Sequence, residues 1–160
     1  MERALRTNAA IENILEKYAD TVYRIAFART KNAHDAEDIM QEVFMRFIKR
    51  APVFESEEHE KAWFIRVAVN CSKSLLASPW RNRVTGDQGD TPFFDKEKSE
   101  VWYAVASLPE KTRVVIHLYY YEDMSVAEIA SATGKSQSAV KTTLHRGRQR
   151  LKEILTNEEF

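Results

Sequence analysis

The sequence predicts an all-α protein in which an N-terminal helical bundle is joined by a flexible linker to a C-terminal helix-turn-helix domain. Only 4 Gly and 4 Pro occur in 160 residues, and the overall composition favours helices over a β sandwich or barrel. Apolar residues recur at helical spacing over most of the chain. In residues 79–98 this periodicity is lost, and Gly, Pro and Asp gather as in a linker. The expected division is therefore residues 1–78, the linker at 79–98, and residues 99–160.

Two helices are expected at the start of the chain. The first covers residues 9–29, and a break follows at Lys31 and Asn32. The second begins near Asp35, a residue type that caps helices well, and Pro52 ends it because proline cannot continue the hydrogen-bond ladder. One side of this second helix is apolar, which predicts that it packs in the core: Ala36, Ile39, Met40, Val43, Phe44, Phe47 and Ile48.

A third helix is expected at residues 61–76, after an acidic loop at 55–60 and before Pro79. Cys71 lies in its apolar pattern, so we expect a buried free thiol. As the single cysteine of the chain, it excludes an internal disulfide and a cysteine-based zinc site. The residues around His59 lack the spacing of a metal motif. No metal, cofactor or catalytic residue is therefore expected.

The C-terminal part carries the pattern of a helix-turn-helix. A helix from Pro109 to about Tyr121 precedes it. Ser125 and Glu128 are spaced for a capping box at the start of a short helix, and Gly134 suits the positive φ angle of the following turn.

Ser136 is expected to cap the final helix, with Val140 and Leu144 facing inward. Its other face is polar and basic, as in a helix that meets base edges in the major groove. These outward residues are Gln137, Ser138, Lys141, Thr142, His145, Arg148 and Gln149. Arg146, Arg150 and Lys152 add charge for phosphate contacts. The sequence therefore predicts a protein that binds duplex DNA and is not an enzyme.

The formal net charge of zero is unusual for a protein that grips DNA alone, because Lys and Arg supply most non-specific affinity. Either the binding is local and weak, or a larger partner supplies the rest of the grip. We see no signal peptide and no apolar stretch near the roughly 20 residues that span a bilayer. The expected location is the cytoplasm.

Three segments, in this order, resemble the extracytoplasmic-function (ECF) sigma factors of bacterial RNA polymerase. They are AEDIMQEVFMRF at 36–47, AWFIRVAVN at 62–70, and LPEKTRVVIHLYYYEDMSVAEIASATGKSQSAVKTTLHRGRQRL at 108–151. The resemblance leaves out only the first residues, the linker and the tail. It implies a monomeric, dissociable subunit that binds core polymerase and directs promoter-specific initiation. It also implies control by an anti-sigma factor.

The resemblance also implies roles for residues of this chain. The second helix would bind the clamp coiled coil of the largest polymerase subunit through Asp38, Gln41, Glu42 and Arg46. The third helix and its preceding loop would open the minus-ten element through Phe54, Trp63, Phe64, Arg66, Asn70, Lys73 and Ser74. The last helix would read the minus-thirty-five element through Gln137, Ser138, Lys141, Thr142, Thr143, His145, Arg146 and Arg148.

The sequence departs from this family in a few places. Leu75 to Trp80 stand where several arginines are common, and Gly147 replaces a frequent alanine at a cost of about 1 kcal/mol in helix propensity. Phe93 and Phe94 are apolar in a polar linker, which suggests a docking role. The alternative interpretation of the whole chain is a free-standing helix-turn-helix regulator that binds a palindromic site as a dimer.

Overall fold

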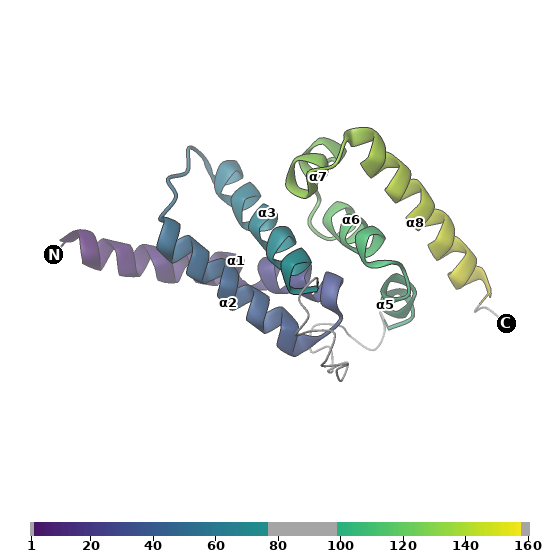
Figure 1. Cartoon of the computed structure of the whole chain (residues 1–160), viewed down its shortest axis with the longest axis horizontal. Helices are drawn as coiled ribbons and strands as arrows, with labels where there is room; N and C mark the ends of the chain where they lie inside the picture. Colours follow the sequence, from purple (N-terminus) through teal and green to yellow (C-terminus); the bar gives the residue numbers. More distant parts are fainter. Residues whose placement is uncertain (1, 77–98, 158–160) are drawn as a thin grey trace.

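The computed structural model describes residues 2–76 and 99–157, and within them every regular element is a helix. The N-terminal bundle consists of α1 (Glu2–Thr30), α2 (Ala33–Arg50) and α3 (Glu57–Leu76). The C-terminal bundle consists of α5 (Ser99–Ala106), α6 (Glu110–Tyr120), α7 (Val126–Thr133) and α8 (Gln137–Asn157) (Figure 1). The predicted all-α fold is confirmed. The expected linker, Pro79 and the Phe93-Phe94 pair lie outside the described residues.

The core of the N-terminal bundle forms where α1, α2 and α3 meet. Val22, Val43, Phe64 and Val69 are all fully buried there. The apolar stripe of α2 is only partly inside, because Ile48 at its C-terminal end remains 47% exposed. The expectation that Ile48 packs in the core is therefore wrong.

The limits of α2 also differ from the expectation. Asn32, not Asp35, is the N-cap: its side-chain oxygen accepts a hydrogen bond from the Asp35 N–H at 3.0 Å. The helix ends at Arg50, where Ala51 adopts a left-handed conformation and its N–H donates to the Phe47 carbonyl. The helix thus stops before Pro52 through its own cap.

Helix α3 begins at Glu57, four residues earlier than expected, so most of the predicted acidic loop is its first turn. The Ser56 hydroxyl accepts a hydrogen bond from the His59 N–H at 3.1 Å and so serves the start of the helix. Acidic side chains suit this position because the N-terminus of a helix is electropositive. Lys17 of α1 pairs with Glu57 at 3.1 Å and with Glu60 at 3.3 Å, which joins this turn to α1.

The helix-turn-helix of the C-terminal bundle forms as its local sequence predicts. The Ser125 hydroxyl accepts from the Glu128 N–H at 3.1 Å, and the Glu128 carboxylate accepts from the Ser125 N–H at 2.9 Å. Gly134 has a φ of 74°, and the Ser136 hydroxyl accepts from the Ala139 N–H. The capping box, the glycine turn and the second cap are therefore confirmed.

The packing of α8 on α6 explains the unusual Gly147. A Cβ atom at this position would lie 2.9 Å from Cδ1 of Ile116 and 3.0 Å from Cγ2 of Thr112. Ile116 is itself buried, so it has little room to move. The glycine therefore allows a close approach of the two helices, which partly offsets its poor helix propensity.

The two bundles pack against each other. The C-terminal half of α1 contacts α6, and α3 contacts α7. Figure 1 shows α3 and α7 side by side, with α8 on the far side of the C-terminal bundle. The outer face of α8 and the outer face of α2 therefore lie at opposite sides of the molecule.

Candidate polymerase and nucleic-acid surfaces

The outward face of α8 is exposed over nearly its whole length. Val140 and Leu144 are buried against α7 and α6, which turns the polar positions away from the bundle. Gln137, Ser138, Lys141, Thr142, His145, Arg146, Arg148 and Gln149 are exposed, and Thr143 is half-buried. The side chains predicted for the minus-thirty-five element thus lie on one accessible helix.

Arg148 differs from the other members of this face because it is held by α6. Its Nε donates a hydrogen bond to the Tyr120 hydroxyl at 2.6 Å, and its guanidinium lies 5.3 Å from the Tyr119 ring centroid and 5.6 Å from that of Tyr120. Tyr120 and Tyr121 are 50% and 46% exposed, so both rings remain partly accessible to solvent. No role was predicted for Tyr120, although its hydroxyl holds a member of the basic face.

The aromatic side chains predicted for the minus-ten element do not share one environment. Phe64 is completely buried, and its ring stacks on that of Tyr18 with 4.4 Å between centroids. No face of this ring is available to a base, so its prediction as a DNA contact is wrong. Its position on α3 points into the core, whereas the neighbouring Trp63 is only half-buried.

Trp63 and Phe54 form the accessible end of an aromatic cluster. The two rings meet edge to face with 5.9 Å between centroids, and both pack against Phe47. His59 of α3 contacts the loop in two ways. Its Nδ1 accepts a hydrogen bond from the Glu55 N–H at 3.1 Å, and its ring packs edge to face on Phe54. The loop that carries Phe54 is therefore fixed on α3 by ring packing and by one backbone hydrogen bond.

The polar residues predicted for the minus-ten element lie along α3. Arg66, Asn70, Lys73 and Ser74 are all exposed. Two of them already face the C-terminal bundle, since Arg66 lines a groove between α3 and α7 and the Lys73 ammonium donates to the Thr133 carbonyl at 3.5 Å. The structure thus brings these side chains to one helix but places α7 beside them.

The outer face of α2 combines charge with exposed apolar surface. Asp38, Gln41 and Glu42 are exposed, and half-buried Arg46 forms an ion pair with Glu42 at 3.0 Å. Met45 and Ile48, on the same helix, are 48% and 47% exposed. No role was predicted for Met45, and Ile48 was expected to pack in the core.

The structure also bears on the single cysteine, on metal binding and on membrane-spanning helices. Cys71 is buried, as predicted, and burial raises the pKa of its thiol above the ordinary value. Within residues 2–76 and 99–157, no group of three or more His, Cys, Asp or Glu side chains is placed to hold a metal ion. None of the described helices is both long and apolar enough to cross a membrane.

Both bundles match families of known proteins. Residues 14–82 match the family described as Sigma-70 region 2, and residues 98–151 match Sigma-70, region 4. The chain is 28% identical over 166 residues to RNA polymerase sigma factor SigV of Bacillus subtilis (strain 168), covering 100% of this chain and 99% of SigV. It is 31% identical over 161 residues to ECF RNA polymerase sigma factor SigM of the same organism, covering 90% and 94%.

The fold is also similar to that of a solved sigma factor. The sigma factor RpoE, in complex with the anti-sigma factor NepR from Bartonella quintana, superimposes with a TM-score of 0.76 at 20% identity, covering 91% of this chain and 96% of RpoE. That likeness concerns the fold, whereas the matches to both sigma regions and to SigM over nearly their full lengths concern the family. The chain therefore belongs to the extracytoplasmic-function family of RNA polymerase sigma factors.

Proposed function

We propose that this chain is a dissociable sigma subunit that binds core RNA polymerase and directs transcription initiation at promoters with minus-ten and minus-thirty-five elements. The observation that carries the proposal is the pair of exposed faces on α2 and α8 in one chain of this family. Neither face is needed for the core of its bundle. A polymerase partner also explains how a chain of zero net charge acts on DNA.

The α2 face is the proposed site for the clamp coiled coil of the largest polymerase subunit. Asp38, Gln41 and Glu42 supply polar contacts, and Met45 and Ile48 supply apolar area that is lost from water on binding. This combination fits an amphipathic helical partner better than a nucleic acid, because carboxylates repel phosphates. We propose that residues 1–78 form the unit that carries this face.

The DNA contacts divide between the two bundles. Trp63 and Phe54 offer ring faces on which an unpaired minus-ten base stacks, and Arg66, Asn70, Lys73 and Ser74 contact the strand beside them. Residues 99–160 form the second unit, in which α8 enters the major groove of the minus-thirty-five element. The proposed base- and phosphate-contacting side chains are half-buried Thr143 and the exposed Gln137, Ser138, Lys141, Thr142, His145, Arg146 and Arg148.

Control by an anti-sigma factor is part of the proposal. RpoE, which shares this fold, was solved in complex with the anti-sigma factor NepR. A partner of that kind, acting in the cytoplasm where the polymerase works, needs only to cover the α2 or α3 faces to prevent initiation.

The test is size-exclusion chromatography of the purified chain with bacterial core RNA polymerase. The wild type is expected to co-elute, and Asp38→Arg/Glu42→Arg is expected to abolish co-elution. Glu12→Arg/Glu16→Arg is the matched control, because it reverses two exposed carboxylates with the same spacing on α1. Absence of co-elution, with a free chain that runs as a dimer, would favour the stand-alone regulator.

A further inference from the structure

We propose that the hydroxyl of Tyr120 and the guanidinium of Arg148 together clamp one backbone phosphate of the DNA duplex that α8 enters. The identity of that duplex as the minus-thirty-five element rests on the proposed function, whereas the clamp itself rests on the geometry around Arg148. Tyr120 is the last residue of α6. The clamp therefore adds a DNA contact from a second helix to those that α8 makes.

Arg148 is held in one orientation by two tyrosines of α6. Its Nε donates a hydrogen bond to the Tyr120 hydroxyl at 2.6 Å. The guanidinium carbon lies 5.3 Å from the ring centroid of Tyr119 and 5.6 Å from that of Tyr120, within the range of cation–π contacts. The two rings meet edge to face with 5.0 Å between their centroids. This exposed arginine is thus ordered before it meets DNA, so less side-chain entropy is lost on binding.

The contacts leave both side chains able to donate to an anion. Tyr120 engages Nε, so its hydroxyl does not occupy the two terminal nitrogens that form the fork of the guanidinium. The Tyr120 oxygen acts as the acceptor in this bond, so its own O–H proton can serve a further partner. Among the described residues, no carboxylate forms an ion pair with Arg148, whereas Arg150 pairs with Glu153 at 3.3 Å. The charge of Arg148 is therefore not neutralised within the protein.

The place of Arg148 on α8 favours a phosphate over a base as its partner. Gln137 is the first residue of α8, and Arg148 lies about 16 Å further along the axis at about 1.5 Å per residue. The N-terminal residues of such a helix meet the base edges, and the major groove is about 12 Å wide. A side chain this far back lies at the rim of the groove, where the sugar-phosphate backbone runs. A phosphate there can accept from the arginine fork and from the tyrosine hydroxyl together.

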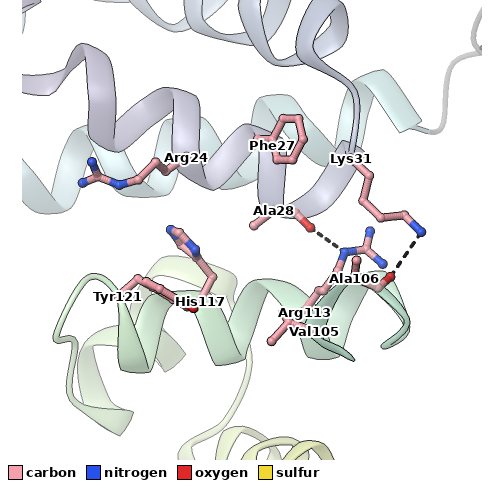
Figure 2. A pocket seen from close by; sticks show the side chains of 9 residues that line it. All are labelled: Arg24, Phe27, Ala28, Lys31, Val105, Ala106, Arg113, His117 and Tyr121. Atoms are coloured by element: carbon pink, nitrogen blue, oxygen red, sulfur yellow. Dashed lines mark hydrogen bonds between the residues drawn. The ribbon is translucent and has the colours of Figure 1, made fainter. Parts of the chain in front are cut away.

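The neighbouring Tyr121 provides a matched comparison for Tyr120. The two side chains are exposed to a similar degree, 46% for Tyr121 and 50% for Tyr120. The ring of Tyr121, however, stacks on that of His117 with 5.2 Å between centroids and lines the pocket between α6 and the end of α1, as Figure 2 shows. Tyr121 therefore faces α1, whereas Tyr120 contacts α8. Only Tyr120 is placed to share a ligand with Arg148.

The test measures how single side-chain changes alter the contribution of single phosphates to binding. The probe is a DNA duplex selected from a randomised library by the wild-type chain with core RNA polymerase, or by the chain alone if it does not bind polymerase. A methylphosphonate replaces one phosphate at a time, which removes a negative charge and an acceptor oxygen. Affinity is measured for the wild type, for Tyr120→Phe and Arg148→Ala, and for the control Tyr121→Phe.

For the wild type and Tyr121→Phe, the methylphosphonate at one position is expected to weaken binding about tenfold, as for the loss of charge-assisted hydrogen bonds. Tyr120→Phe is expected to bind the unmodified duplex about fivefold more weakly and to show a smaller penalty at that position alone. Arg148→Ala is expected to abolish the penalty there. A general loss of stability would lower affinity without changing the penalty at a single phosphate.

Three outcomes would overturn the clamp. They are a Tyr120→Phe chain that binds as tightly as the wild type, a Tyr120→Phe chain that keeps the full penalty at every phosphate, and an equal effect of Tyr121→Phe. A chain that does not bind polymerase but shows the expected pattern on the selected duplex would refute the proposed function and leave the clamp standing. A wild type that binds no duplex, with or without polymerase, would overturn both.

Discussion

The two surfaces proposed to read the promoter are built in opposite ways. In the N-terminal bundle, Trp63 and Phe54 are the accessible end of an aromatic cluster that continues through Phe47 to the fully buried Phe64. In the C-terminal bundle, the α8 face is polar and is separated from the core by Val140 and Leu144. The first surface is continuous with the packing of the core, whereas the side chains of the second take no part in core packing.

This difference predicts how substitutions behave. A change in the aromatic cluster is expected to alter both the stability of the N-terminal bundle and promoter opening, because the same rings pack against the core and stack on the unpaired base. A change on the α8 face alters DNA binding alone. Four substitutions, ordered by their expected effect on the free energy of unfolding, separate the two cases.

Phe64→Ala is expected to have the largest effect, a loss of about 4 kcal/mol in the free energy of unfolding, as for a fully buried aromatic ring that leaves a cavity. The ring contacts Tyr18, Phe44 and Phe47, so all three helices of the N-terminal bundle lose packing. Urea unfolding followed by circular dichroism measures the loss. A loss below 1 kcal/mol would show that Phe64 is not part of the core and would reopen its role at the DNA.

Trp63→Ala is expected to cost about 2 kcal/mol, less than Phe64→Ala because the indole is only half-buried. Its larger effect is expected on promoter opening, since base–aromatic stacking contributes about 1–3 kcal/mol per base. Permanganate reactivity of unpaired thymines in the holoenzyme complex measures the opening. Trp63→Phe is the control and should retain most of it; equal opening by Trp63→Ala and wild type would remove Trp63 from the DNA site.

The difference between Phe64 and Trp63 also shows what the sequence allows one to predict. The fold class, the capping box at Ser125 and the turn at Gly134 are local and were predictable, because each depends on residues a few positions apart. Two adjacent aromatic residues on one helix, however, differ by about 100° in direction, and the packing of α1 and α2 decides which one is buried. The family resemblance implied a DNA role for both residues without distinguishing the two directions.

Other features depend on partners that no local pattern reveals. The expected acidic loop is instead mostly the first turn of α3, because the Ser56 hydroxyl serves the start of the helix and Lys17 of α1 pairs with Glu57 and Glu60. Arg113 was not predicted to have any role, because its partners are main-chain carbonyls, two of which lie 84 and 85 residues away. Every residue has a backbone carbonyl oxygen, so the residue type of the partner does not indicate such a contact.

Gly147→Ala tests the close contact between α6 and the inward face of α8. We expect a net loss of about 1 kcal/mol in the free energy of unfolding, because overpacking against Ile116 costs about 1–3 kcal/mol and the gain in helix propensity returns about 1. Thermal unfolding of the variant measures it. In the double variant Gly147→Ala/Ile116→Val, which removes the colliding Cδ1 atom, the two losses should be less than additive; strict additivity would contradict the contact.

Lys141→Ala is expected to have the smallest effect on stability, within about 0.5 kcal/mol of wild type, because the side chain is exposed and packs on nothing in the core. Binding of the holoenzyme to promoter DNA should nevertheless weaken, and if the ammonium meets a phosphate, the slope of log affinity against log salt should fall by about 0.9. Lys111→Ala, an exposed lysine of α6 off the recognition face, is the control. Equal loss of DNA affinity in both variants would mean that the basic residues act through the overall electrostatic field of the C-terminal bundle. The α8 face would then not be a separate DNA-reading surface.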